Sequence, residues 1–188
     1  DNSKDGGNEM SVWDTPTTTK KLDDRQVAKE VPFIGQNHIK VQIEPFIEEQ
    51  SMPHVLLTGD PGMGKTQFAK WIAWQRGKPF FERMSPVKPE SLPPYGVLLL
   101  DEVHQQRSVE SLFEAMDQGL LTFIAATTKP QLLDQAFRSR FLISVKMRRY
   151  SIDEMIEMMT LMLSGEGDPE HINVLAHAAD GHPRTAEQ

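Results

Sequence analysis

The chain has 188 residues, no cysteine and a formal net charge of −7, with 38% hydrophobic and 25% charged residues. This composition is typical of a soluble globular protein of one domain, with room for a small appendage. It excludes disulfides, thiolate catalysis and zinc–thiolate sites, and the acidic balance argues against binding DNA with the whole surface. We recognise no signal peptide and no apolar run long enough to cross a membrane, so we expect a cytoplasmic protein without membrane contact.

The first 31 residues are polar, and we interpret residues 1–31 as an N-terminal arm or linker. The composition changes at residue 32, where we place the start of the main domain. A helix is predicted over 36–49, because Ile39, Ile43 and Phe46 fall roughly on one helical face.

A glycine-rich segment after the first apolar strand dominates the chain. It fits the phosphate-loop pattern G-x-x-x-x-G-K-[ST] at every fixed position. Residues 54–58 before it are apolar enough for a buried strand, and residues 67–73 after it have the pattern of a helix. The segment consists of Gly59, Asp60, Pro61, Gly62, Met63, Gly64, Lys65 and Thr66.

Each part of this loop suits the binding of a nucleoside triphosphate. Its glycines allow a tight turn in which successive N–H groups point at phosphate oxygens, and the following helix N-terminus adds partial positive charge. We expect Lys65 to reach the β- and γ-phosphates and the Thr66 hydroxyl to bind Mg²⁺. The alternative is a glycine-rich strand-to-helix turn that holds no ligand.

A second acidic motif follows the short apolar run 97–100, which is typical of a central strand in a parallel sheet. Asp101 at the end of that strand can hold the Mg²⁺ that Thr66 also contacts. Glu102 then stands where it can polarise a water for attack on the γ-phosphate. Acidic pairs after strands are common, so the hypothesis depends on combining this pair with the phosphate loop.

The remaining elements alternate between strands and helices, which predicts an α/β fold with a five-stranded parallel sheet. From Ser151 the pattern is helical only, and Ser151 with Glu154 forms a capping box. We therefore divide the chain into a large α/β domain at 32–150 and a small helical domain at 151–188. Besides those above, the predicted strands are 79–84, 120–126 and 142–145, the predicted helices are 108–118, 130–137, 151–163 and 169–179, a further helix opens after Gly181, and 85–96 is an irregular loop.

Four further residues are candidates for contacts with phosphate. Thr127 ends a buried strand and can hydrogen-bond the attacking water or the γ-phosphate, although such a residue is more often part of a turn. Arg138 and Arg140 precede the last strand, where arginines usually form a solvated face but can also stabilise charge in a neighbouring subunit. Arg184 follows Gly181 and can fold over the phosphates.

These motifs, in this order, resemble an AAA+ ATPase. Within that superfamily the chain is most similar to the RuvB-type motor that drives Holliday-junction branch migration. The resemblance covers about 150 residues and is carried by the segments 33–36, 43–46, 54–66, 97–104, 123–128, 138–141 and 181–184.

The resemblance implies a role for each matching residue, with ATP and Mg²⁺ as the cofactors. Arg140 matches an arginine finger that acts in trans, which implies a homo-oligomer, usually a hexameric ring or spiral with ATP at subunit boundaries. The helical residues after 150 match a small lid domain. The other roles are an adenine pocket at Phe33, Ile34 and Gly35, Walker A at 59–66 with the adjoining Gln67, Walker B at Asp101 and Glu102, sensor 1 at Thr127 and sensor 2 at Arg184.

Two departures from the pattern concern the partner. The stretches from Walker A to Walker B and from Glu102 to Thr127 are short, and a RuvB-like motor usually carries an inserted hairpin in the second of them. The sequence also stops within the lid. DNA, or a DNA-bound complex, is therefore the expected partner on family resemblance rather than on a basic surface.

Four functions remain open on the sequence. The leading one is an ATP-hydrolysing motor that acts on DNA or on a DNA-bound complex. A clamp-loader-like assembly ATPase would use the same motifs. A two-domain helicase is suggested by Asp101-Glu102-Val103-His104 but needs a second sheet domain, and a non-hydrolysing regulatory protein would not need the acidic pair.

Overall fold

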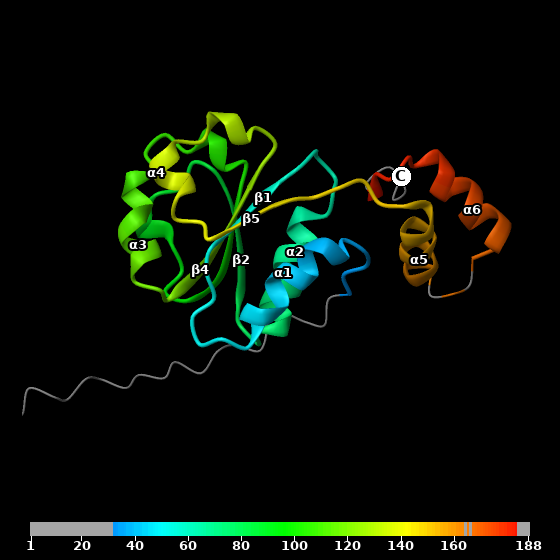
Figure 1. The fold of residues 1–188 in the computed structure, drawn as a ribbon, viewed down its shortest axis with the longest axis horizontal. Helices are drawn as coiled ribbons and strands as arrows, with labels where there is room; N and C mark the ends of the chain where they lie inside the picture. Colours follow the sequence, from blue (N-terminus) through cyan, green and yellow to red (C-terminus); the bar gives the residue numbers. More distant parts are fainter. Residues whose placement is uncertain (1–31, 164, 166, 184–188) are drawn as a thin grey trace, which may run out of the picture.

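The computed structural model describes residues 32–163, 165 and 167–183 (Figure 1). The predicted N-terminal arm at 1–31 and Arg184 lie outside the described residues, as does all but the beginning of the helix predicted to open after Gly181.

Five parallel strands form one sheet in the order β2-β3-β4-β1-β5. This confirms the predicted five-stranded α/β fold. Because all strands run the same way, their carboxyl ends meet at one edge of the sheet, which is where ligands bind in folds of this type. The strands are β1 (Val55–Thr58), β2 (Phe80–Met84), β3 (Gly96–Asp101), β4 (Leu121–Thr127) and β5 (Ile143–Lys146).

Helices cover both faces of the sheet, so successive side chains of the central strands pack into two separate cores. In β3, Leu99 packs under α1 (Asn37–Ile47) and α2 (Lys65–Gln75). Its neighbours Leu98 and Leu100 pack on the other face. That face is covered by α3 (Phe113–Asp117) and α4 (Gln135–Arg138). Figure 1 shows the two pairs of helices on opposite sides of the strands. Burial on both faces explains why these strands are apolar throughout.

Two predicted helices are shorter and more broken than the sequence suggested. Residues 108–118 contain a 3₁₀ turn at Glu110–Leu112 and then α3, with no inserted hairpin before β4. Residues 130–137 contain a 3₁₀ turn at Pro130–Leu132, an extended Leu133, and only then α4. The second break has a clear cause, because the Asp134 side chain accepts a hydrogen bond from Ala136 N and starts a new helix.

The helical part of the chain consists of α5 (Ile152–Met162) and α6 (Pro169–Ala178). Both predicted starts are confirmed: Ser151 and Glu154 form the capping box, and Asp168 caps α6 ahead of Pro169. The two helices share a small core of their own, made of Tyr150, Met155, Met159, Ile172, Ala176 and Ala179. Within the described residues, none of the helices is both long and apolar enough to cross a lipid bilayer.

Candidate phosphate-binding site at the carboxyl edge of the sheet

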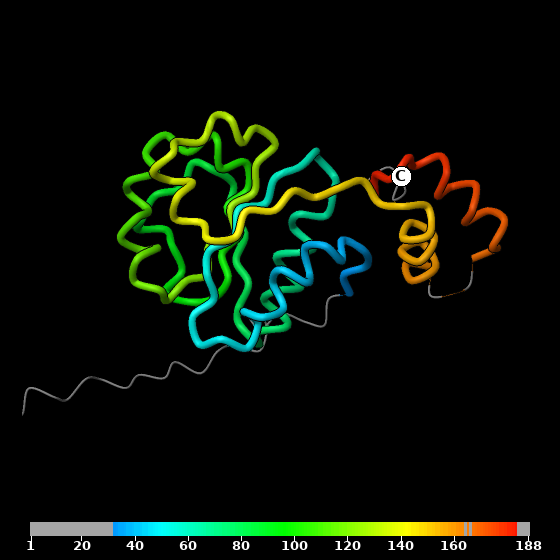
Figure 2. The backbone as a smooth tube through the Cα atoms, in the orientation of Figure 1, coloured from blue at the N-terminus to red at the C-terminus, as the bar shows by residue number. Residues whose placement is uncertain are grey.

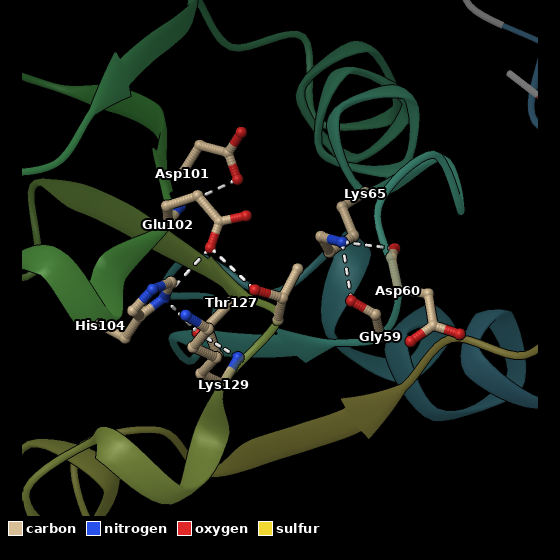
Figure 3. Close-up of polar contacts among 9 residues, drawn as sticks. Gly59, Asp60, Lys65, Asp101, Glu102, His104, Thr127 and Lys129 are labelled. Carbon is tan, nitrogen blue, oxygen red and sulfur yellow. Dashed lines mark hydrogen bonds and ion pairs between the residues drawn. The ribbon is translucent and has the colours of Figure 1, made fainter.

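The glycine-rich loop leads from β1 into α2, as the motif predicted. Lys65 is the first residue of α2 and is 8% exposed. Its ammonium group donates hydrogen bonds to the carbonyl oxygens of Gly59 at 2.9 Å and Asp60 at 2.8 Å (Figure 3). These contacts hold the charged end of Lys65 over the loop, where an anionic phosphate would be attracted to it.

Gly64 shows why this loop needs glycine at that position. Its φ of +82° lies in the left-handed region, which a side chain disfavours. A Cβ added there would also lie 3.0 Å from the Tyr150 hydroxyl oxygen. Tyr150, which lies in the chain segment that leads to α5, therefore packs against the glycine-rich loop.

Two carboxylates follow β3 at the same edge. Asp101 ends the strand, and its Oδ1 accepts a hydrogen bond from Glu102 N at 2.9 Å. Glu102 adopts a left-handed conformation with φ of +46°. The sharp turn after Asp101 therefore sends the Glu102 side chain in a new direction, towards the end of β4.

Thr127, His104 and Glu102 form one polar cluster between β3 and β4. The His104 Nδ1 atom lies 3.0 Å from Thr127 Oγ1 and 3.1 Å from Glu102 Oε2 (Figure 3). Thr127 is fully buried, and its hydroxyl oxygen also accepts a hydrogen bond from Lys129 N. Thr128 donates a hydrogen bond to Glu102 Oε2 at 3.2 Å. The structure therefore links Glu102, the candidate for polarising the attacking water, to Thr127, the candidate phosphate contact, through His104.

A cavity of about 690 Å³ opens over the loop and brings most predicted site residues together. Of the predicted nucleotide contacts, it is lined by Phe33, Ile34, Pro61, Gly62, Gly64, Lys65, Thr66, Gln67, Asp101 and Glu102. Gly35, Gly59, Asp60 and Met63 do not line this cavity. The predicted pocket is thus assembled from the segment before α1, the loop and the end of β3.

The structure also brings residues to this cavity that no sequence motif marked. They are Tyr150 and several methionines of α5, among them Met155 and Met159. Burial raises the pKa of Tyr150 to about 12, so its hydroxyl stays protonated near neutral pH. The apolar stripe of α5 was visible in the sequence, but a helix stripe alone does not say which surface it covers.

The oxygen atoms near Thr66 suit Mg²⁺. Thr66 and Asp101 both line the cavity, and Thr66 Oγ1 lies 3.5 Å from Glu82 Oε1. Within the described part of the chain, no three His, Cys, Asp or Glu side chains group closely enough to form a metal cage. Mg²⁺ is commonly held by one or two protein oxygens together with phosphates and waters, so this sparse set of hard oxygen ligands fits it.

Arg140 lies at the opposite edge of the sheet, just before β5 begins. Its Nη1 contacts Asp117 Oδ1 at 2.7 Å, and its guanidinium carbon lies 3.8 Å from the centre of the Phe113 ring. It also lies near His54, directly before β1, whose pKa is lowered by burial and, to a smaller extent, by Arg140. Because the length of β5 separates Arg140 from the phosphate loop, the structure does not bring it to the cavity of its own chain.

Comparison with known proteins places the chain in a family. The model of the Holliday junction DNA helicase RuvB P-loop domain matches residues 26–121, which is more than half of the chain. This chain belongs to the RuvB P-loop domain family. The resemblance to RuvB-type AAA+ ATPases is therefore confirmed.

Individual RuvB proteins extend the similarity beyond that domain. The Holliday junction branch migration complex subunit RuvB of Lacticaseibacillus casei BL23 is 31% identical over 208 aligned positions, covering 90% of this chain and 61% of the relative. The RuvB subunit of Bdellovibrio bacteriovorus is 29% identical and covers 94% of this chain and 63% of the relative. The Thermotoga maritima RuvB Holliday junction branch migration motor superposes with a TM-score of 0.72 at 30% identity, over 82% of this chain and 60% of that one.

Two differences in length accompany these similarities. The chain spans about three-fifths of the length of the curated relatives it matches. The alignment with the Lacticaseibacillus protein is also longer than the 188 residues of this chain, so that relative carries internal segments without a counterpart here. The short spacing between Glu102 and Thr127 agrees with this observation.

Thr127 gives a direct test of the polar cluster. Thr127→Val keeps the shape of the side chain but leaves Lys129 N and His104 without the hydroxyl they contact, so we expect a loss of about 1–3 kcal/mol in the free energy of unfolding. Urea denaturation measures this loss. Thr127→Ser retains the hydroxyl and should lose less.

The matched control is Thr122→Val in the same strand. Thr122 is buried, and its hydroxyl has no hydrogen bond within the described residues, so this change should cost less than about 1 kcal/mol. Equal losses for the two valine variants would contradict a special role of the Thr127 hydroxyl.

Proposed function

We propose that the protein is an AAA+ ATP hydrolase that drives branch migration of DNA, or remodels a DNA-bound complex, as part of an oligomer. The observation that carries this proposal is the cavity shared by the glycine-rich loop, Asp101 and Glu102 at the carboxyl edge of the sheet. The relatives named above supply the substrate class of the proposal, because they are named as a branch migration complex subunit and a branch migration motor. A cytoplasmic location, expected from the sequence, fits this work.

The residues of the cavity suit ATP in a specific orientation. The loop amides and Lys65 would bind the phosphates, while Phe33, Ile34 and Tyr150 form an apolar wall for the base. Thr66 and Asp101 would hold Mg²⁺, which neutralises charge on the β- and γ-phosphates when bound. Arg184 as a contact from the helical domain, and the division of the chain at residue 150, also remain part of the proposal.

Glu102 is the residue we assign to hydrolysis. Its carboxylate would accept a proton from a water whose oxygen forms a bond to the γ-phosphorus, while the bond from that phosphorus to the β–γ bridging oxygen breaks. The products are ADP and inorganic phosphate. Thr127 would orient the same water or the γ-phosphate, and its link to Glu102 through His104 supports a concerted arrangement of the two side chains.

Glu102→Gln tests this assignment. The amide keeps the size of the side chain but cannot act as a base, so we expect nucleotide binding within about threefold of wild type and a fall in phosphate release of at least about a hundredfold. Phosphate release and binding of a fluorescent ATP analogue measure the two effects separately. Steady-state hydrolysis that stays unchanged in this variant would refute the mechanism.

Arg140 is the basis for proposing a homo-oligomer, with a hexameric ring or spiral as the expected form. A phosphate contacted by Arg140 has to belong to another chain, because this side chain lies at the sheet edge remote from its own loop. One subunit would then present Glu102 to a nucleotide and its neighbour would present Arg140 to the same nucleotide.

Mixing two inactive variants tests this shared site. Arg140→Ala and Glu102→Gln subunits should each hydrolyse ATP poorly alone. In a random equal mixture, about a quarter of the interfaces would combine an intact Glu102 with an intact Arg140, so we expect about a quarter of wild-type activity to return. Phosphate release from the mixture, followed against total protein concentration, gives the result. A mixture no more active than its components would argue that Arg140 does not act in trans.

A clamp-loader-like assembly ATPase is the second candidate, and two observations favour it. No hairpin is inserted between Glu102 and Thr127, and the net charge of −7 argues against binding DNA with the whole surface. A fluorescent four-way DNA junction separates the candidates. The motor predicts ATP-dependent conversion to duplex products, whereas the assembly ATPase predicts ATP-dependent complex formation without conversion.

A further inference from the structure

The segment before α1 is fastened to the chain that leads into α5 by an unusual side-chain pairing. Gln36 is 3% exposed and has a left-handed backbone with φ of +52°. Its side-chain amide pairs with the peptide groups of Arg148: Nε2 donates to Arg148 O at 2.6 Å, and Oε1 accepts from Arg148 N at 3.1 Å. These two residues are 112 positions apart in the sequence, so the pairing joins two ends of the α/β domain.

A single carboxylate extends this connection to the first turn of α5. Glu154 Oε1 accepts a hydrogen bond from Gln36 N at 3.2 Å, and Glu154 Oε2 accepts one from Ser151 N at 2.8 Å. Hydrogen bonds to an ionised acceptor are stronger than those between neutral groups. Glu154 therefore binds both the segment before α1 and the beginning of the helical domain.

Gly35 makes the close approach of this carboxylate feasible. A Cβ added at Gly35 would lie 2.5 Å from Glu154 Oε1 and 3.0 Å from the Tyr150 ring, distances that require one of these groups to move. Its φ of +68° also disfavours a side chain. Glycine at this position therefore allows Glu154 to pack directly on the backbone.

Gln36 and Glu154 do not line the cavity themselves, but residues close to each of them in the sequence do. Phe33 and Ile34, next to Gly35, form one part of the cavity wall, and Tyr150 and Met155, on either side of the capping box, form another. Figure 2 shows the blue segment before α1 on the side of the α/β domain that faces α5. The contact between Gln36 and Glu154 thus holds two walls of the cavity at a fixed separation.

We propose that Glu154 and Gln36 are positioning residues for the nucleotide: they lock the segment before α1 to the helical domain and so preorganise the wall that receives the base. This proposal rests on the proposed function, since it takes the cavity to be the nucleotide site. Without the lock, the two walls of the cavity would have to become ordered when the nucleotide binds. The free-energy cost of this ordering would weaken the affinity for nucleotide. ATP and ADP should be affected alike, because the base is common to both and the γ-phosphate is remote from the lock.

The competing explanation is that Glu154 only completes the capping box of α5. The chain offers a variant that separates the two roles. Ser151→Ala removes the hydroxyl that caps α5 but leaves both hydrogen bonds to the Glu154 carboxylate, which come from backbone N–H groups. Glu157→Ala removes an exposed carboxylate from the same helix and controls for charge.

Equilibrium binding of fluorescent ATP and ADP analogues tests the proposal in the full chain. We expect Glu154→Ala to raise Kd for both nucleotides by about tenfold or more, because it removes the charge-assisted hydrogen bond from Gln36 N that joins the two walls. Glu154→Gln keeps one acceptor oxygen in place of two and loses the charge, so its Kd should lie between those of wild type and Glu154→Ala. Ser151→Ala and Glu157→Ala should stay within about threefold of wild type. KM for ATP should follow Kd while kcat changes less than about twofold. Equal weakening by Ser151→Ala and Glu154→Ala would overturn the proposal in favour of simple helix capping.

A distance measurement tests the lock independently of nucleotide. The chain has no cysteine, so Val41→Cys on α1 and Val174→Cys on α6, both highly exposed, accept a pair of spin labels. Without nucleotide, we expect one narrow distribution of distances between the two spin labels when Glu154 is present. We expect a broad distribution when Glu154→Ala is added. A distribution unchanged by Glu154→Ala would refute the lock. Failure of the wild type to bind nucleotide, with the narrow distribution present, would instead refute the proposed function.

Discussion

Parallel pairing of β1 with β4, and of β4 with β3, is the constraint on which the rest of this structure depends. The register sets Thr58 beside Thr127, so the strand that enters the glycine-rich loop ends level with the strand that carries the buried hydroxyl. Because β3 runs parallel on the far side of β4, Asp101 and Glu102 emerge at the same edge. A one-residue slip in either pairing would turn these side chains towards the opposite face. The apolar packing on both faces of the sheet therefore also fixes the geometry of the polar edge.

Most of the sheet and of the phosphate loop could be predicted, because both depend on local sequence. The loop motif contains its own glycines, lysine and hydroxyl, and the continuous apolar runs identify buried parallel strands without knowledge of their neighbours. The capping box at Ser151 and the cap at Asp168 were equally local and were found. The two broken helices were not, because the choice between a continuous helix and a 3₁₀ turn followed by a new cap depends on small competing interactions. At Asp134 the side chain, rather than the preceding turn, satisfies a free backbone N–H.

The contacts that complete the site could not be read from sequence for a different reason. His104 meets Thr127 from 23 residues away, and Gln36 meets Glu154 from 118 residues away. No periodicity or motif connects such positions. Tyr150 is similar, because an isolated tyrosine between a strand and a helix has no sequence pattern that predicts its contact with Gly64. His104 meets Thr127 because β3 pairs with β4. Tyr150, Gln36 and Glu154 come together only because β5 lies beside β1 and the chain runs on from β5 to α5.

Arg140 raises the question of whether its contacts within one chain are compatible with a role in another. Its partner Asp117 has a side chain that is 62% exposed, and ion pairs of this kind contribute about 0–1 kcal/mol. Stacking on Phe113 adds about 0.5–1 kcal/mol at an exposed site. A hydrogen bond to a charged phosphate contributes about 1.5–3 kcal/mol. The Nε atom of Arg140 is also buried without a hydrogen-bond partner among the described residues, so the guanidinium would gain a hydrogen bond by moving to a phosphate. If the proposed shared site exists, this balance would favour a guanidinium that is held by Asp117 and Phe113 in the single chain and released when a neighbour presents a nucleotide.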